Sequence, residues 1–490
     1  MNREFLLNAI FLILVNVLIK PFYVFGIERK IQDTVGAETY GLYATLFSFS
    51  FLLFMLNDFG IHYFNNRNIA RHPQLVGKYF PNILALKFLL TAVYLVAVFV
   101  AALIRGFEME IFYLLFFIAL NHVLISMVAY LRSNISGLGM YRTDSLVSTL
   151  DKVLLIGICA VLLWGPLQGA NGGFQIEWFV HAQNASWLLT ALVAFFIVKK
   201  NIRQKLVIRF RRPFLVAVLK KSAPYALAVF LMTAYTRFDI VVLEWILPDG
   251  RHEAGVYAAG YRLLDALNMV GYLFAGLLLP MFSTLLKKQE KNEADASEIT
   301  SLLRLSLEVI WAGTATVAIA CFFFRGELMH WLYPETATAY YGDVLAFIIL
   351  TLVPFSGIFI YSTLLTANNS LKKMNWLFGS GIVVNLALNL LLIPAYKAVG
   401  AGCSAFATQT FVLVGMMFLA KKELHLAMDW RQASKIASFI LLVIIANWLL
   451  FYFSQADWLL RFTAALAIGL LLAIALRLLR IKMLLGLVKH

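Results

Sequence analysis

The chain has 490 residues, of which 62% are hydrophobic and only 14% are charged, and its mean hydropathy is +0.82. Soluble domains carry about 25% charged residues, so the composition excludes a soluble multidomain protein. The formal net charge of +15 does not indicate nucleic-acid binding, because the basic residues lie in short segments between apolar runs. In that position they act as determinants of membrane topology.

Apolar runs that can each cross a hydrocarbon core of roughly 30 Å recur along the chain and predict about fourteen transmembrane helices. The first run lacks a small-residue cleavage site before Lys20, which favours a membrane helix over a removed signal peptide. The expected helices span 5–27, 40–64, 79–104, 111–132, 144–165, 176–199, 215–247, 254–286, 303–324, 341–366, 374–394, 399–421, 433–453 and 458–480.

The basic segments fix an orientation. NNRNIARHPQLVGK, KKNIRQKLVIRFRRP and SLKKMN all fall on one side when the connections are numbered alternately. Lys and Arg accumulate in cytoplasmic loops. The sequence therefore predicts a bacterial inner-membrane protein with both termini in the cytoplasm.

A short internal repeat groups the helices. Glu38-Thr39-Tyr40-Gly41-Leu42-Tyr43-Ala44 and Glu253-Ala254-Gly255-Val256-Tyr257-Ala258 stand at the outer ends of the second and eighth expected helices. Six helices separate the copies, so the two halves run in the same direction. We expect an all-α membrane protein with an N-lobe (1–199, helices 1–6), a basic cytoplasmic linker (200–213), a C-lobe (214–424, helices 7–12) and a C-terminal helix pair (425–490).

Three stretches carry a family resemblance. VGAETYGLYATLFSFSFLLFMLNDFG, YTRFDIVVL (235–243) and VVNLALNLLLIPAYKAVGAGCSAFAT (383–408) resemble signatures of the polysaccharide-transporter, or oligosaccharide flippase, branch of the MATE-containing MOP superfamily. Two departures stand out. Lys397 and Ala398 replace the usual glycine after Tyr396, and Cys403 stands at an alanine position.

The resemblance implies two lobes around a central cavity, alternating access, and a polyprenyl-diphosphate-linked oligosaccharide (an O-antigen, capsule or exopolysaccharide unit) as cargo. It implies membrane lipid and this glycan as partners, together with other polysaccharide-assembly membrane proteins, and we expect a monomer. No cofactor is expected beyond a coupling H⁺ or Na⁺. A Na⁺- or H⁺-coupled multidrug extruder and a peptidoglycan-precursor flippase of the same fold are alternatives, and a membrane-embedded glycan polymerase or ligase is disfavoured by the short outer loops.

Charged residues inside the apolar runs are the candidate site, because each costs at least about 2.5–3.5 kcal/mol at a helix centre unless it has a partner or a water-filled cavity. An excess of cations favours a diphosphate headgroup over a cationic drug. The expected cations and acids are Lys20, Lys87, Lys152, Arg237 and Arg262 against Asp151, Asp239 and Asp265.

Arg237 and Asp239 in helix 7 match the depths of Asp265 and Arg262 in helix 8, at roughly 15 Å and 12 Å from the outer ends. Two crossed salt bridges, Arg237–Asp265 and Asp239–Arg262, are one interpretation. The other is that the arginines bind phosphate in the cavity while the acids carry a coupling ion.

Each of the remaining polar residues has a structural and a functional interpretation. Lys20 precedes Pro21 and lines a kink or snorkels to the interface, whereas Lys87 is deep enough to favour exposure to a cavity. Asp151 and Lys152 are adjacent and are expected to pair with other helices rather than with each other. The sequence also suggests three further pairs: Asp58 with His62, Arg304 with Glu308 on the surface, and Asn385 with Asn389 as hydrogen-bonding or sugar-contacting amides.

No motif for an enzyme is present. Walker A and His-Glu-x-x-His sequences are lacking, and Cys159, Cys321 and Cys403 lie singly inside apolar runs, where small buried hydrophobes are expected. The sequence predicts a transporter without catalytic or metal-ligating residues.

Overall fold

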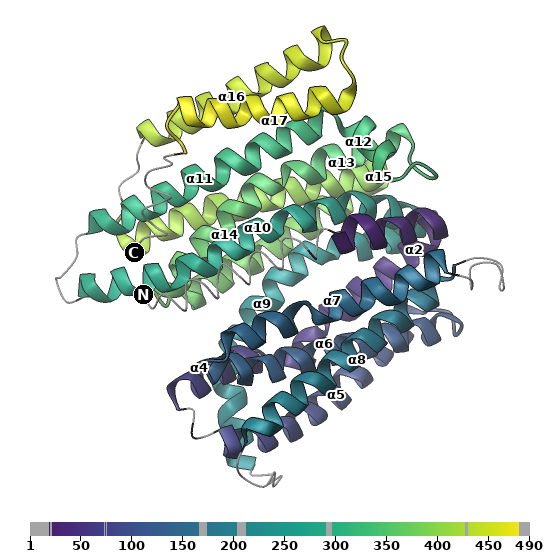
Figure 1. Cartoon of the computed structure of the whole chain (residues 1–490), viewed down its shortest axis with the longest axis vertical. Helices are drawn as coiled ribbons and strands as arrows, with labels where there is room; N and C mark the ends of the chain where they lie inside the picture. Colours follow the sequence, from purple (N-terminus) through teal and green to yellow (C-terminus); the bar gives the residue numbers. More distant parts are fainter. Residues whose placement is uncertain are drawn as a thin grey trace. The chain divides into compact units, whose positions relative to one another are not determined.

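A computed structural model describes residues 19, 22–72, 74, 76–165, 174–202, 212–290, 296–426 and 430–479. These residues form helices and the turns between them, with no strand in the described ranges. The chain divides by its internal contacts into two helical units, 1–244 and 245–490 (Figure 1).

The first unit is a helical bundle in which α6 is central, packing against α2, α4, α7 and α8. Its core is apolar and includes Phe80, Tyr130 and Leu131. Its elements are η1 (Tyr23–Glu28), α2 (Arg29–Leu52), α3 (Phe54–Asp58), α4 (Ile61–Arg71), α5 (Val76–Arg105), α6 (Ile111–Gly137), α7 (Tyr141–Trp164), α8 (Ile176–Asn201) and α9 (Arg212–Ile246), whose last two residues belong to the second unit.

The second unit packs α10, α13, α14 and α15 against one another, with α11 beside α13 and α14. Its elements are α10 (Gly250–Glu290), α11 (Ala296–Phe323), α12 (Arg325–Leu332), α13 (Ala339–Leu350), α14 (Leu352–Ala367), α15 (Leu371–Leu424), α16 (Trp430–Phe453) and α17 (Trp458–Ala475).

The helix pair α16 and α17 lies against α11 (yellow beside green in Figure 1). Close contact requires a glycine here, because a Cβ on Gly469 would lie 2.3 Å from Cγ2 of Thr316. Phe439 and Val443 of α16 and Ala473 of α17 share an apolar core with Ala312 of α11. Small residues that let helices approach are typical of helix packing in membranes.

Most expected helices are confirmed, and the differences lie at breaks. The helix expected at 40–64 is wrong: Phe59 and Gly60 are both left-handed and separate α3 from α4. The helix expected at 341–366 is divided at Thr351. Those expected at 374–394 and 399–421 are the two arms of α15, divided at Lys397 (φ 51°, ψ −132°).

Gly36 makes a similar break within α2, with φ 82° and ψ 166°, a conformation that is essentially restricted to glycine. The residues before Gly36 extend beyond the first expected helix, which ended at 27. Ten of the described helices are long and apolar enough to cross a membrane, with both arms of α15 counted as one. The number fourteen and the four-part domain division stay predictions, and most of the expected linker lies outside the described residues.

Candidate functional site

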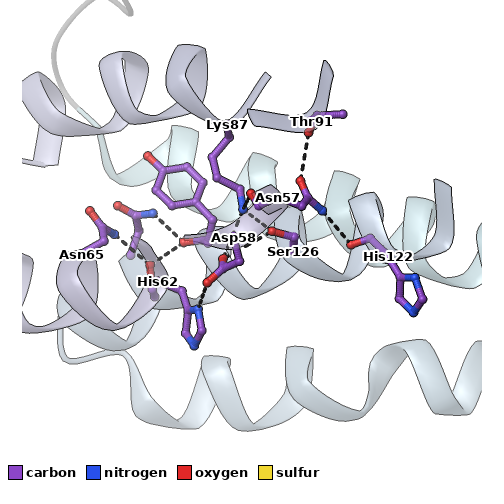
Figure 2. A network of polar contacts seen from close by, with 11 residues as sticks. Asn57, Asp58, His62, Asn65, Lys87, Thr91, His122 and Ser126 are labelled. Atoms are coloured by element: carbon purple, nitrogen blue, oxygen red, sulfur yellow. Dashed lines mark hydrogen bonds and ion pairs between the residues drawn. The ribbon is translucent and has the colours of Figure 1, made fainter. Parts of the chain in front are cut away.

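A buried polar network occupies the first unit where the helix breaks at Phe59–Gly60 (Figure 2). The left-handed residues end the helical hydrogen-bond ladder, so the carbonyl of Asn57 is available to another donor. Lys87 Nζ of α5 donates to it at 3.1 Å. The same ammonium lies 3.2 Å from Oδ1 of Asp58 and also donates to the Ser126 hydroxyl.

Lys87 is therefore a buried structural cation. Its exposed fraction is 1%, so the expectation that it lines a cavity is wrong. A lysine in the membrane interior needs a counter-charge and acceptors. Asp58, Asn57 and Ser126 supply them from α3 and α6.

The predicted pairing of Asp58 with His62 is confirmed. Nδ1 of His62 lies 2.6 Å from Oδ2 of Asp58, so the carboxylate contacts Lys87 through one oxygen and the imidazole through the other. The His62 side chain is 28% exposed, whereas that of Asp58 is 6% exposed. The imidazole is thus the most accessible member of this group of three.

The network continues along α6 to His122, which is fully buried. The Asn57 amide donates to the His122 carbonyl at 3.1 Å and accepts from Thr91 at 3.2 Å (Figure 2). The His122 ring contacts the Ser50 hydroxyl at 3.0 Å.

Asp151 and Lys152 correct a second expectation. Although they are adjacent on α7, Nζ of Lys152 lies 3.2 Å from Oδ2 of Asp151. The long lysine side chain folds back, and its ammonium also lies 4.6 Å from the ring centroid of Tyr23 and 5.3 Å from that of Trp187. Two aromatic faces and one carboxylate stabilise the cation, which is 21% exposed.

Arg262 and Asp265 pair within α10 at 3.8 Å, as an i,i+3 contact. Their side chains are 19% and 32% exposed, so neither is fully buried. On α9, Arg237 is half-buried and Asp239 is 1% exposed. The crossed pairs expected between α9 and α10 would join the two units and stay a prediction.

The remaining predicted residues have mixed outcomes. Lys20 lies outside the described residues. Asn385 and Asn389 share one face of α15 as expected: the Asn389 amide donates to Oδ1 of Asn385 at 3.1 Å, and both side chains are fully buried. Arg304 pairs with Glu308 at 3.1 Å, but Glu308 is only 2% exposed, so this is no surface pair.

The count of buried charges needs a correction as well. The expected inventory of three acids omitted Asp58, and the described residues bury four further carboxylates, those of Glu28, Asp33, Glu253 and Glu308. Tyr40 donates to Glu28 at 3.0 Å. The interior therefore lacks the clear cationic excess that the sequence suggested, and charge balance no longer decides between an anionic and a cationic cargo.

Sequence reasoning missed a second polar cluster, which lies in the second unit at the break in α15. The break in α15 leaves the N–H of Ala398 without a helical partner, and it donates to Oε2 of Glu253 and to the Tyr340 hydroxyl, both at 3.2 Å. Lys397 Nζ lies 2.5 Å from Oδ2 of Asp249 and 3.5 Å from Oε1 of Glu253. The sequence feature that could have indicated this cluster is Lys397 itself, because it stands where the family resemblance leads one to expect glycine.

The pKa values follow from these contacts. The hydrogen bond from Lys397 lowers the pKa of the Asp249 carboxyl and, in return, raises the pKa of the Lys397 ammonium. At neutral pH Asp249 is therefore charged beside Lys397.

An all-helical chain with ten such membrane-length helices is a multi-pass membrane protein. Residues 5–286 match the family described as polysaccharide biosynthesis protein, and the chain belongs to this family. It is 23% identical over 404 residues to a Shigella dysenteriae protein named "Putative O-antigen transporter", covering 82% of this chain and 96% of that relative.

Two solved structures share the fold. The lipid II flippase MurJ, in its inward closed conformation, superposes with a TM-score of 0.66 at 16% identity, over 97% of each chain. An inward-facing multidrug resistance MATE transporter of the MOP superfamily gives a TM-score of 0.63 at 13% identity, over 81% of this chain and 94% of the other. The fold implied by the sequence resemblance is therefore confirmed.

Proposed function

We propose that the protein is a flippase that moves a polyprenyl-diphosphate-linked oligosaccharide from the cytoplasmic to the outer leaflet by alternating access, without chemical conversion of the cargo. The observation that carries this proposal is the match to the O-antigen transporter relative across 96% of its length. The family and the fold shared with a lipid II flippase support it.

Within this proposal, partly exposed cations bind the diphosphate. Arg262, Lys152 and Arg237 are each at least partly accessible, and a guanidinium can bind two phosphate oxygens at once. We propose Asp239, Asp265 and Asp151 as the acids that carry a coupling H⁺ or Na⁺. Lys87 is left out because its buried pairing with Asp58 keeps it from any cargo.

The cargo is tested by deleting the gene and measuring where lipid-linked oligosaccharide accumulates. We expect accumulation in the cytoplasmic leaflet and loss of surface glycan, both reversed by the intact chain. Unchanged glycan export combined with altered drug resistance would favour the extruder. Failure to replace an essential lipid II flippase would separate the protein from the peptidoglycan class, whose flippase MurJ shares the fold, as the multidrug MATE transporter does.

The binding residues are tested by complementing the deletion with Arg237→Ala and Arg262→Ala. We expect each variant to reach the membrane at normal level but to lose transport. Arg325→Ala is the matched control, because Arg325 pairs with Asp343 at 3.6 Å and both side chains are well exposed. Full transport by both variants would remove these arginines from the proposed site.

We also propose that the protein lies in the cytoplasmic membrane with both termini inside. Lys and Arg gather on one side of the predicted topology. Fluorescent-protein and alkaline phosphatase fusions at the C-terminus and after Asp249 test this. Fluorescence at the C-terminus and phosphatase activity after Asp249 are expected, and the reverse pattern would contradict the orientation.

A further inference from the structure

A cavity of about 380 Å³ lies within the second unit, among α11, α14, α15 and α16. It is separate from every residue assigned to the cargo above. Trp311, Phe418 and Ile436 contribute apolar walls, while Arg304 and Lys421 contribute positive charge. The volume is at the lower end of the range for ligand pockets, roughly 300–1,000 Å³.

The polarity of the lining changes along the helices. Thr300 stands one turn before Arg304 on α11, and Trp311 lies roughly 16 Å from Thr300 along the helix axis. On α15, Lys421 is followed inward by Val414, about 10 Å away. The cavity therefore has a polar, cationic end near the helix termini and an apolar end deeper in the bundle.

The cationic end has more positive than negative charge. Arg304 and Lys435 share one carboxylate, Glu308, at 3.1 Å and 3.6 Å. Lys421 is exposed and makes no ion pair in the part of the chain that the structure describes. The residues that line the cavity therefore include two cations, Arg304 and Lys421, and no acid, so this end favours an anion.

The position of the cavity is held by packing and by a hydrogen bond. Gln432 of α16 donates to the carbonyl of Arg304 at 3.2 Å, which fixes α16 against α11 beside the cationic end. Lys435 also donates to the carbonyl of Arg477, at 3.0 Å. The site therefore lies where the C-terminal helix pair joins the rest of the unit.

We propose that this cavity binds an anionic diacyl phospholipid. One acyl chain fills the apolar end and the headgroup phosphate contacts Arg304 and Lys421. A free phosphate would leave the apolar walls without a ligand, whereas a neutral lipid would leave the cations unused. Anionic lipids of the cytoplasmic leaflet interact with basic groups at about 1 kcal/mol each, and the lipid would join α16 to α11. This proposal does not depend on the identity of the cargo.

Native mass spectrometry of the purified full chain tests the proposal with phosphatidylglycerol and phosphatidylcholine. We expect preferential retention of phosphatidylglycerol and, for Lys421→Gln, about fivefold weaker binding of it with phosphatidylcholine unchanged. Lys422→Gln is the matched control, since Lys422 is exposed but does not line the cavity. Equal effects of the two substitutions would overturn the proposal.

A second pair of variants tests the apolar end. Ala433→Phe places a ring in the cavity and should reduce binding of phosphatidylglycerol, whereas Ala437→Phe, at an exposed alanine one turn further along α16, should not. Inorganic phosphate that competes as well as the lipid would point to a simple anion site. Displacement by polyprenyl phosphate at lower concentration than phosphatidylglycerol would point to a cargo-tail site, and either result would refute the phospholipid. Because binding is read without transport, failure here is distinct from failure of the flippase proposal.

Discussion

Lys87 in the first unit and Lys397 in the second make the same kind of contact in different surroundings. Each lies beside a helix break and contacts a buried carboxylate, Asp58 or Glu253. At the first break the lysine binds a carbonyl that the helix leaves open. At the second, Glu253 binds the open N–H, of Ala398.

Exposure separates the two sites. The side chain of Lys87 is 1% exposed and that of Lys397 is 48% exposed. A fully desolvated charge depends on its partner, whereas a charge in contact with water can replace its partner with solvent. Loss of the lysine–carboxylate pair should therefore destabilise the protein strongly in the first unit and only weakly in the second.

The largest expected effect is that of Lys87→Met. It leaves Asp58 buried without its lysine, and breaking a buried ion pair costs about 3–5 kcal/mol. We expect a strongly lowered apparent Tm and little folded protein in detergent, measured by thermal unfolding of the purified chain.

Two further variants make this prediction specific. Lys87→Met combined with Asp58→Asn should recover much of the loss, because no unpaired charge stays buried. Lys373→Met is the control: its pair with Glu423 is shorter, 2.6 Å against 3.2 Å for Lys87 and Asp58, but Lys373 is 59% exposed. A double variant as unstable as Lys87→Met would show that the ion pair is not the cause.

A smaller loss is expected for Glu253→Ala. This change removes the acceptor shared by Tyr340 and the Ala398 N–H, and unsatisfied buried groups cost about 1–3 kcal/mol each. Asp249→Ala removes the more exposed carboxylate of the same cluster and should change the apparent Tm much less. Equal Tm values for the two variants would show that burial does not distinguish these acids.

How well the sequence predicted the fold depended on the range of the interactions involved. Apolar runs located most helices to within a few residues, because length and hydropathy are local properties. The break at Phe59–Gly60 was missed, since a left-handed Phe59 depends on tertiary contacts. The break at Thr351 did have a local signal, Pro354, because a proline lacks the N–H that would donate to the carbonyl of Leu350.

The candidate site was harder to predict for the same reason. The Asp58–His62 pair was found because i,i+4 neighbours on a helix can be read from spacing. Lys87 reaches Asp58 from another helix, and no pattern in α5 indicates which helix that is. For Asp151 and Lys152 the prediction failed in the opposite way. The Cβ atoms of adjacent helical residues point in different directions, which argued against an ion pair, but the flexible Lys152 side chain folds back to the Asp151 carboxylate.

A still smaller effect tests the backbone at Lys397. Its φ of 51° with ψ of −132° suits glycine better than a residue with a Cβ. Lys397→Gly and Lys397→Ala lose the same ammonium, but only glycine relieves the strain. We expect the glycine variant to have the higher apparent Tm, by about 1–2 °C. An alanine variant of equal or higher Tm would show that the break is unstrained.

The smallest expected effect is the pH dependence of the Asp249–Lys397 contact. Lys397 lowers the folded-state pKa of Asp249, so this contact stabilises the protein above the unfolded-state pKa of about 3.9. The contribution is lost as the pH falls through the lower folded-state value. Asp249→Asn should therefore lower the apparent Tm slightly at pH 7, by about 1 °C, and the difference should disappear well below pH 4. Both side chains are well exposed, so only a small Tm difference is expected. A large Tm difference at pH 7 would mean that Lys397 depends on its carboxylates as Lys87 does. The proposed difference between the two lysines would then be wrong.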